Sequence, residues 1–141
     1  MAGRLTIQVV ERDDDYLGLD IRASSERFAG SARVFAGLDD LAELAERISG
    51  FPQSATDERR YEVGSQESNI AGGHCSLRFI CSDGAGHARL EVVLKDDAAR
   101  HEPGSASFGF QVFAVDIDRF VLMLRGLEAR RLPEARLEIV E

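Results

Sequence analysis

The side chains best suited to nucleophilic or metal chemistry are two cysteines and three histidines, and their spacing predicts neither kind of site. Cys75 and Cys81 are six residues apart in one predicted strand, so the rise of a strand separates them by roughly 20 Å. A disulfide or a shared zinc ion needs its sulfur atoms far closer than that. We therefore expect two buried, unpaired thiols, no metal site and no cofactor.

No other group of residues predicts a catalytic centre. Strand alternation places Cys81 and His87 on opposite faces, which argues against a thiolate–imidazole pair. No serine lies in the G-x-S-x-G context of a nucleophile elbow. The glycine pairs at residues 72–73 and 84–86 do not open a helix after a strand, so they predict turns rather than a phosphate loop. We expect that the protein is not an enzyme.

Carboxylates form the remaining polar clusters. Three acids stand together in a predicted turn, and three more lie along the outer face of a predicted helix. Three consecutive acids in a tight turn cannot all converge on a hard cation without carbonyl oxygens, so a solvated turn is favoured over a calcium site. The alternative is contact with a basic partner. The candidate partner-binding residues are Asp13, Asp14, Asp15, Asp40, Glu43 and Glu46.

The charge balance narrows the choice of partners. The 141 residues carry a formal net charge of -8, and Lys95 is the only lysine. An acidic surface repels phosphate, which disfavours nucleic acid and anionic membranes and favours a basic protein. No apolar run approaches the ~20 residues of a membrane span, and the N-terminal residues lack the apolar stretch of a signal peptide. Because the thiols are unpaired, we expect a cytoplasmic location.

The hydrophobic pattern predicts a single α+β domain over residues 1–141, without an internal repeat. Period-two alternation predicts one layer of mostly antiparallel sheet with about 6–8 strands, because the connections between strands are short. Apolar residues spaced three and four apart predict two amphipathic helices, at about residues 38–50 and 116–131, which pack on the sheet. The expected strands include residues 17–23, 27–36, 60–63, 75–81, 88–94 and 108–114.

The clearest pairing is a hairpin between residues 75–81 and 88–94. A single register aligns the apolar residues on one face and places opposite charges together on the other. The expected partners are Cys81 with Ala88, Phe79 with Leu90, Leu77 with Val92, and Arg78 with Glu91.

Three further expectations concern the remaining elements. Pairing Ile21 with Gly30, and Leu19 with Ala32, would set large residues opposite small ones on a face that accepts a helix. Apolar residues on the second face of the strand at residues 108–114, Phe113 and Val115, predict a central strand that is covered on both sides. Asp116 is the expected N-cap of the second helix.

Three segments also carry a family resemblance: ERFAGSARVFAGLDDLAELAERISGFP, SLRFICSDGAGHARLEVVLKDD and SFGFQVFAVDIDRFVLMLRGLEA. Their order resembles that of a group of small bacterial proteins that includes WapI-type immunity proteins. The resemblance implies a protein that binds and neutralises a cognate toxin, often a nuclease, in the cytoplasm of the producing cell. The matching positions are Phe28 and Gly30, residues 39–44, Asp83–His87, and residues 116–124.

Two alternatives to a domain that binds a basic toxin remain open. The first is a small-molecule-binding or weakly enzymatic domain, in which polar residues converge near His87, Arg89 and Glu91. The second is a scaffold that forms a homodimer by pairing edge strands.

Overall fold

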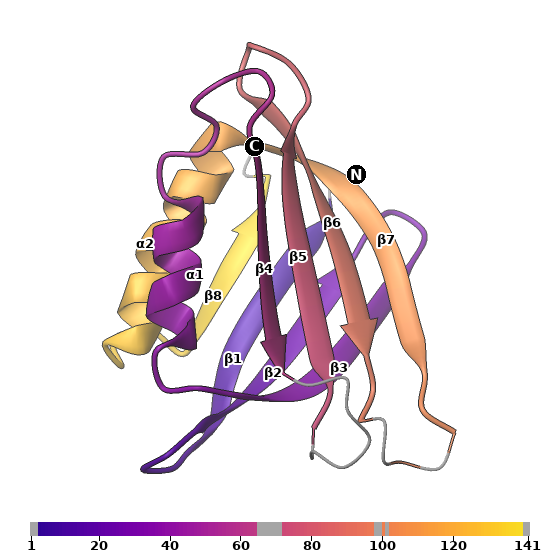
Figure 1. Ribbon diagram of the computed structural model, residues 1–141, viewed down its shortest axis with the longest axis vertical. Coiled ribbons are helices and arrows are strands. Elements are labelled where there is room, and N and C mark those ends of the chain that lie inside the picture. Colours follow the sequence, from indigo (N-terminus) through magenta and orange to yellow (C-terminus); the bar gives the residue numbers. More distant parts are fainter. Residues whose placement is uncertain (1–2, 65–71, 98–99, 101, 140–141) are drawn as a thin grey trace.

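The computed structural model describes residues 3–64, 72–97, 100 and 102–139, which contain eight strands and two helices (Figure 1). Both the α+β class and the antiparallel pairing are as the sequence predicts. The elements, in chain order, are β1 (Arg4–Arg12), β2 (Leu17–Ser24), β3 (Ala29–Ala36), α1 (Asp40–Ile48), β4 (Glu58–Gly64), β5 (His74–Cys81), β6 (His87–Lys95), β7 (Ser105–Phe113), α2 (Ala114–Glu128) and β8 (Glu134–Glu138).

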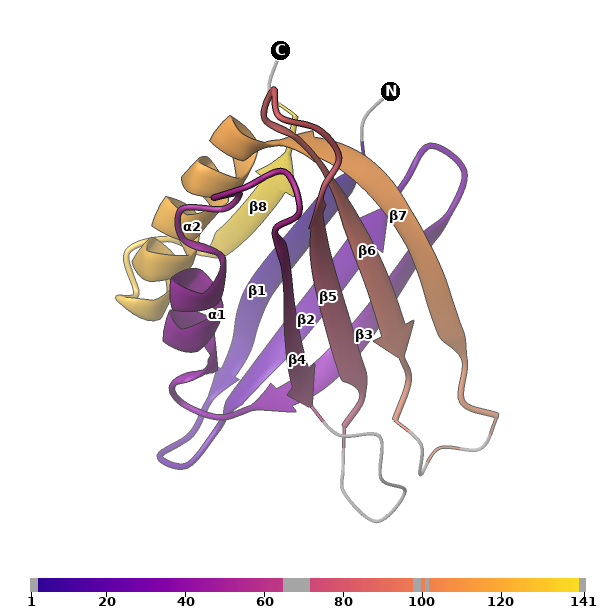
Figure 2. The same ribbon diagram turned by 45° about the horizontal axis from the view of Figure 1, so that its top comes forward.

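The strands form two sheets instead of the expected single layer. Sheet A has the order β3-β2-β1-β8 and sheet B the order β4-β5-β6-β7. The two sheets face each other, and α1 and α2 lie side by side along one side of them (Figures 1 and 2). The apolar faces of the two sheets are thus buried against each other and against the two helices. The buried residues of both sheets and both helices form one continuous cluster.

The topology repeats although the sequence does not. Sheet B is a four-stranded meander followed by α2, and the strands β8, β1, β2 and β3 form a second meander followed by α1. β8 completes this second unit from the far end of the described chain. Helix α1 contacts β4, and α2 contacts β8. Each helix therefore packs against the first strand of the opposite unit.

The hairpin of β5 and β6 has the predicted register at all four pairs. Arg78 and Glu91 are neighbours on the outer face, where the Nη1–Oε1 distance is 2.9 Å. On the inner face Phe79 and Leu90 are fully buried. Agreement between apolar and charged faces was therefore sufficient to fix this register.

The predicted pairing of β2 with β3 is wrong by two residues. Ile21 pairs with Ala32 and Leu19 with Val34. A tight turn sets this register, since the Ser25 amide donates to the Phe28 carbonyl at 2.7 Å. The small residue Gly30 does not accept a helix: a Cβ there would lie 2.9 Å from the Cβ of Ala106, so the other sheet approaches at this point.

β7 is an edge strand and not the predicted central strand. Val115, read as part of the strand's second face, belongs to α2 and is 56% exposed. Helix α2 begins at Ala114 because the Asp116 carboxylate accepts a hydrogen bond of 2.9 Å from the Phe113 amide. Asp116 thus caps the helix from its third position, and Phe113 occupies the N-cap.

Candidate functional site

The two thiols are buried in the sheet, as the sequence predicts. Cys75 is completely buried, and burial raises the pKa of its thiol to about 12, so it remains protonated at neutral pH. Cys81 is nearly buried and its Sγ donates to the Asp83 carbonyl oxygen at 2.9 Å. Both cysteines are free, as expected.

His87 takes part in a turn and not in a pair with Cys81. Its Nδ1 lies 2.5 Å from Asp83 Oδ2, and its ring packs on Phe113 with 5.1 Å between centroids. The Asp83 carboxylate also accepts the Ala85 amide at 2.7 Å. Hydrogen bonds from the His87 side chain and then the Ala85 amide hold the pKa of Asp83 below its usual value. The D-x-x-G-H motif of the sequence therefore forms a turn that is stabilised by its own hydrogen bonds and that packs against the start of α2.

His74 is the one buried histidine among the residues described. Its Nε2 lies 2.9 Å from Glu62 Oε1, while its Nδ1 has no hydrogen-bond partner in the described structure. The other histidine with described surroundings, His87, begins β6 at the opposite end of the hairpin. No group of three metal-ligating side chains occurs within the described ranges. No described helix is long and apolar enough to cross a membrane.

The six candidate acids fall on two elements and differ in what they contact. The Tyr61 hydroxyl donates to Asp40 Oδ1 and lies 3.2 Å from Glu43 Oε2. Burial and the two carboxylates raise the pKa of Tyr61, so this phenol stays a donor. Asp40 Oδ2 also accepts the Gly37 amide at 2.6 Å. Asp40 and Glu43 therefore anchor α1 to β4, which reduces what they can offer a partner.

The remaining candidate acids are more open. Glu46 is 3.6 Å from Arg125 of α2, and its side chain is 81% exposed. Asp13–Asp15 are exposed in the turn between β1 and β2, which projects from the body of the molecule in both views (Figures 1 and 2). The only side-chain contact described for these three is from Asp13 Oδ1 to the Asp15 amide, at 3.4 Å. Their carboxylates carry the least compensated charge of the six.

The outer face of sheet B carries a ladder of ion pairs. Arg78 lies 2.9 Å from both Glu58 and Glu91, and Arg89 lies 3.5 Å from Glu91. Hydrogen bonds from Arg78 and then Arg60 lower the pKa of Glu58 from 4.5 to about 2. Charges across the strands β4, β5 and β6 thus neutralise one another.

This ladder predicts a pH-dependent contribution to stability. The folded pKa of Glu58 lies below its ordinary value, so its stabilisation is complete above about pH 4.5 and is lost as the pH falls towards 2. We expect the variant Glu58→Gln to melt below the wild type at pH 7, with a difference in melting temperature that shrinks as the pH falls from about 4.5 towards 2. Thermal melts across this range test it, with Glu128→Gln, an exposed acid outside the ladder, as control. A difference that is as large near pH 2 as at pH 7 contradicts the assignment.

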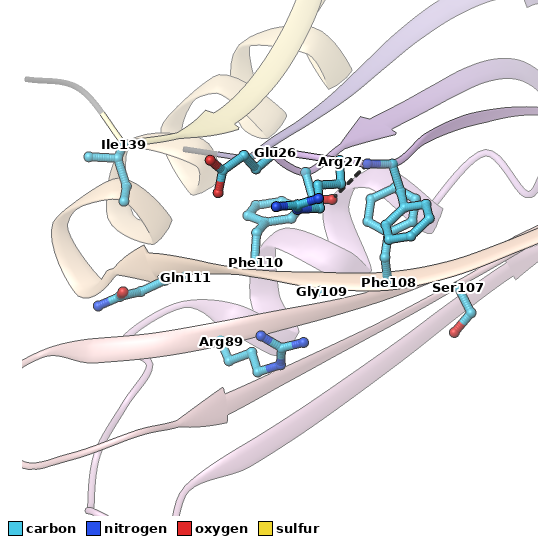
Figure 3. A pocket seen from close by; sticks show the side chains of 12 residues that line it. Glu26, Arg27, Arg89, Ser107, Phe108, Gly109, Phe110, Gln111 and Ile139 are labelled. Atoms are coloured by element: carbon cyan, nitrogen blue, oxygen red, sulfur yellow. Dashed lines mark hydrogen bonds between the residues drawn. The ribbon is translucent and has the colours of Figure 1, made fainter. Parts of the chain in front are cut away.

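A groove of about 680 Å³ runs beside β7, and no pattern in the sequence predicts it directly. Figure 3 shows Phe108 and Phe110 pointing towards the turn between β2 and β3, while Arg89 and Ser107 lie on the other side of the strand. The turn contributes Arg27 and Phe28, and the Phe28 ring is 65% exposed. The lack of charge in β7 was the available signal, whereas the prediction of a central strand came from Phe113 and Val115.

These features define a small α+β domain of two antiparallel sheets, with an acidic surface and an open groove along one sheet edge. Comparison of the chain with protein-family models, with curated proteins and with solved structures gives no match. Its function is therefore argued from its own charges and surfaces.

Proposed function

We propose that this chain is a non-enzymatic protein-binding domain whose partner is a basic protein. The finer form of the proposal follows the resemblance to WapI-type proteins: an immunity protein that neutralises a toxin, for example a nuclease, in a bacterial cytoplasm. An acidic surface supports this role because it competes with phosphate for a basic active site.

The proposal is supported by the distribution of carboxylates that have no basic partner on the described surface. Arginines lie close to acids on the described surface: Arg4, Arg22 and Arg78 each have a carboxylate oxygen within 2.9 Å. Since the chain has 25 acidic and 17 basic residues, local pairing leaves an excess of carboxylates. The Asp13–Asp15 turn concentrates three of them on a projection with no ion pair in the described structure. The negative electrostatic potential around such a turn accelerates association with a cationic protein.

The test is binding to basic toxin domains encoded next to this protein. We expect the triple variant Asp13→Asn, Asp14→Asn, Asp15→Asn to lower the association rate constant by about tenfold at low salt, and less at high salt. The control neutralises three exposed acids elsewhere, Glu102→Gln, Asp118→Asn and Glu128→Gln, and it should change the rate far less. Surface plasmon resonance measures both.

Two results would contradict the proposal. One is the absence of any complex at low salt with the basic domains tested. The other is a triple variant that associates as fast as the wild type, because the projecting turn would then play no part in steering.

A further inference from the structure

The outer edge of β7 differs from the other three strand edges of the two sheets. The Arg33 carbonyl of β3 accepts the Gly73 amide at 2.8 Å, and the Arg60 carbonyl of β4 accepts the Arg47 guanidinium at 2.8 Å. On β8 the Arg136 amide donates to the Met123 sulfur at 3.4 Å. No comparable contact involves the backbone of residues 105–112 within the described chain, apart from pairing with β6. β7 therefore leaves its outer edge open.

The composition of β7 does not protect this edge. Its nine residues, SASFGFQVF, contain no charge and no proline. Natural edge strands normally carry lysine, proline, a bulge or a cover, because an unprotected edge pairs with another strand. An open and uncharged edge of this length predicts that a strand binds there.

The groove beside β7 has a different chemistry on each side of the strand. Towards the turn between β2 and β3 it is aromatic, with Phe28, Phe108 and Phe110. On the other side Arg89 lies over the bare backbone of Gly109, since a Cβ there would be 2.6 Å from Arg89 Nη2. An added strand alternates its side chains between these two sides. It would therefore place apolar residues on the aromatic side and face Arg89 with the residues between them.

The charges of the groove indicate an acidic segment. Arg27 is exposed and forms no ion pair or hydrogen bond with the rest of the described chain, and Arg89 has only the 3.5 Å contact with Glu91. Glu26 is the one acid in the groove lining. We propose that β7 accepts, as a fifth strand of sheet B, an extended peptide segment in which acidic and apolar side chains alternate. This site is separate from the Asp13–Asp15 turn and does not depend on the function proposed above.

A second copy of this chain fits the edge less well. Gly109 is the middle residue of β7, so a two-fold pairing of two β7 strands about their centres would bring together the Arg89 side chains of both copies. Two guanidinium groups on the same face at such a position repel each other. A peptide that supplies a carboxylate there removes this conflict.

The experiment uses two fluorescent nine-residue peptides, one alternating valine with glutamate and the other valine with lysine. We expect the glutamate peptide to bind at least about tenfold more tightly in fluorescence anisotropy, and Arg89→Glu and Arg27→Glu each to weaken it by a similar factor. Arg131→Glu, which makes the same charge change at an exposed site outside the groove, should leave its affinity unchanged. Hydrogen exchange should show new protection of β7 amides when the peptide is bound.

Three outcomes would overturn the proposal. The first is equal binding of the two peptides. The second is the lack of any added protection of the β7 amides up to about 1 mM glutamate peptide, a concentration that corresponds to a binding free energy of about −4 kcal/mol. The third is a dimer in light scattering whose β7 amides are already protected without peptide, which would make a second copy the occupant. The Asp13–Asp15 variant should bind the glutamate peptide normally, so the two proposals fail independently.

Discussion

Phe79→Ala is expected to destabilise the protein by about 3–5 kcal/mol, the range observed when a large aromatic side chain is removed from a core. Phe79 of β5 is fully buried and packs edge to face on Phe51, with 6.2 Å between ring centroids. The Phe51 ring belongs to the connection after α1, so the cavity would open between sheet B and this connection. Because a domain of ordinary stability has only about 5–15 kcal/mol in total, a large fraction would be lost.

Urea unfolding measures this effect directly. The matched control is Phe28→Ala, since Phe28 is 65% exposed and its removal should change the free energy of unfolding by less than about 0.5 kcal/mol. A small effect of Phe79→Ala would contradict the described packing. A large effect of the control would mean that the turn between β2 and β3 is more buried than the structure shows.

Gly64→Ala is expected to cost at least about 3 kcal/mol, because backbone conformation and space both exclude a side chain. Gly64 ends β4 with a φ of 89°, which lies in the region that favours glycine. A Cβ there would be 2.2 Å from the Gly73 carbonyl oxygen and 2.6 Å from Val34 Cγ1. Since the carbonyl belongs to the backbone and Val34 to the opposite sheet, relief would require the strands to separate.

A second glycine provides the control for this substitution. Gly84 lies in the turn between β5 and β6, and a Cβ there would have no atom within 4 Å. Gly84→Ala should therefore change the free energy of unfolding by no more than about 0.5 kcal/mol. Equal midpoints of urea unfolding for the two variants would show that the β4 end is not as crowded as described.

The sequence predicted best where two independent patterns had to agree. In the hairpin of β5 and β6, the apolar residues and the pair Arg78 and Glu91 select one register. In the pairing of β2 with β3, a shift of two residues returns every side chain to the same face. The apolar pattern therefore cannot distinguish Gly30 from Ala32 as the partner of Ile21, and the turn at residues 25–28 decides.

Features that depend on contacts between distant residues were less accessible. Alternation shows which face of a strand is apolar, but not which strand lies beside it, so the division into two sheets was missed. The contacts of Tyr61 with Asp40 and Glu43 join residues about twenty positions apart, which is why these acids looked free. The groove needs β7 at an edge and the turn from the other sheet beside it. Val115 belongs to α2 but continues the alternation of β7, and for this reason the sequence pattern predicted a central strand instead of an edge strand.

The pairing of β8 with β1 also has a consequence for synthesis on the ribosome. Residues 58–113 contain every strand of sheet B, so that sheet can assemble while later residues are still being added. Sheet A must wait, because Leu5 pairs with Leu137 and no earlier segment occupies that position. During this interval β1 is an unprotected edge on a nascent chain, open to pairing with a neighbouring polypeptide until β8 emerges and closes it.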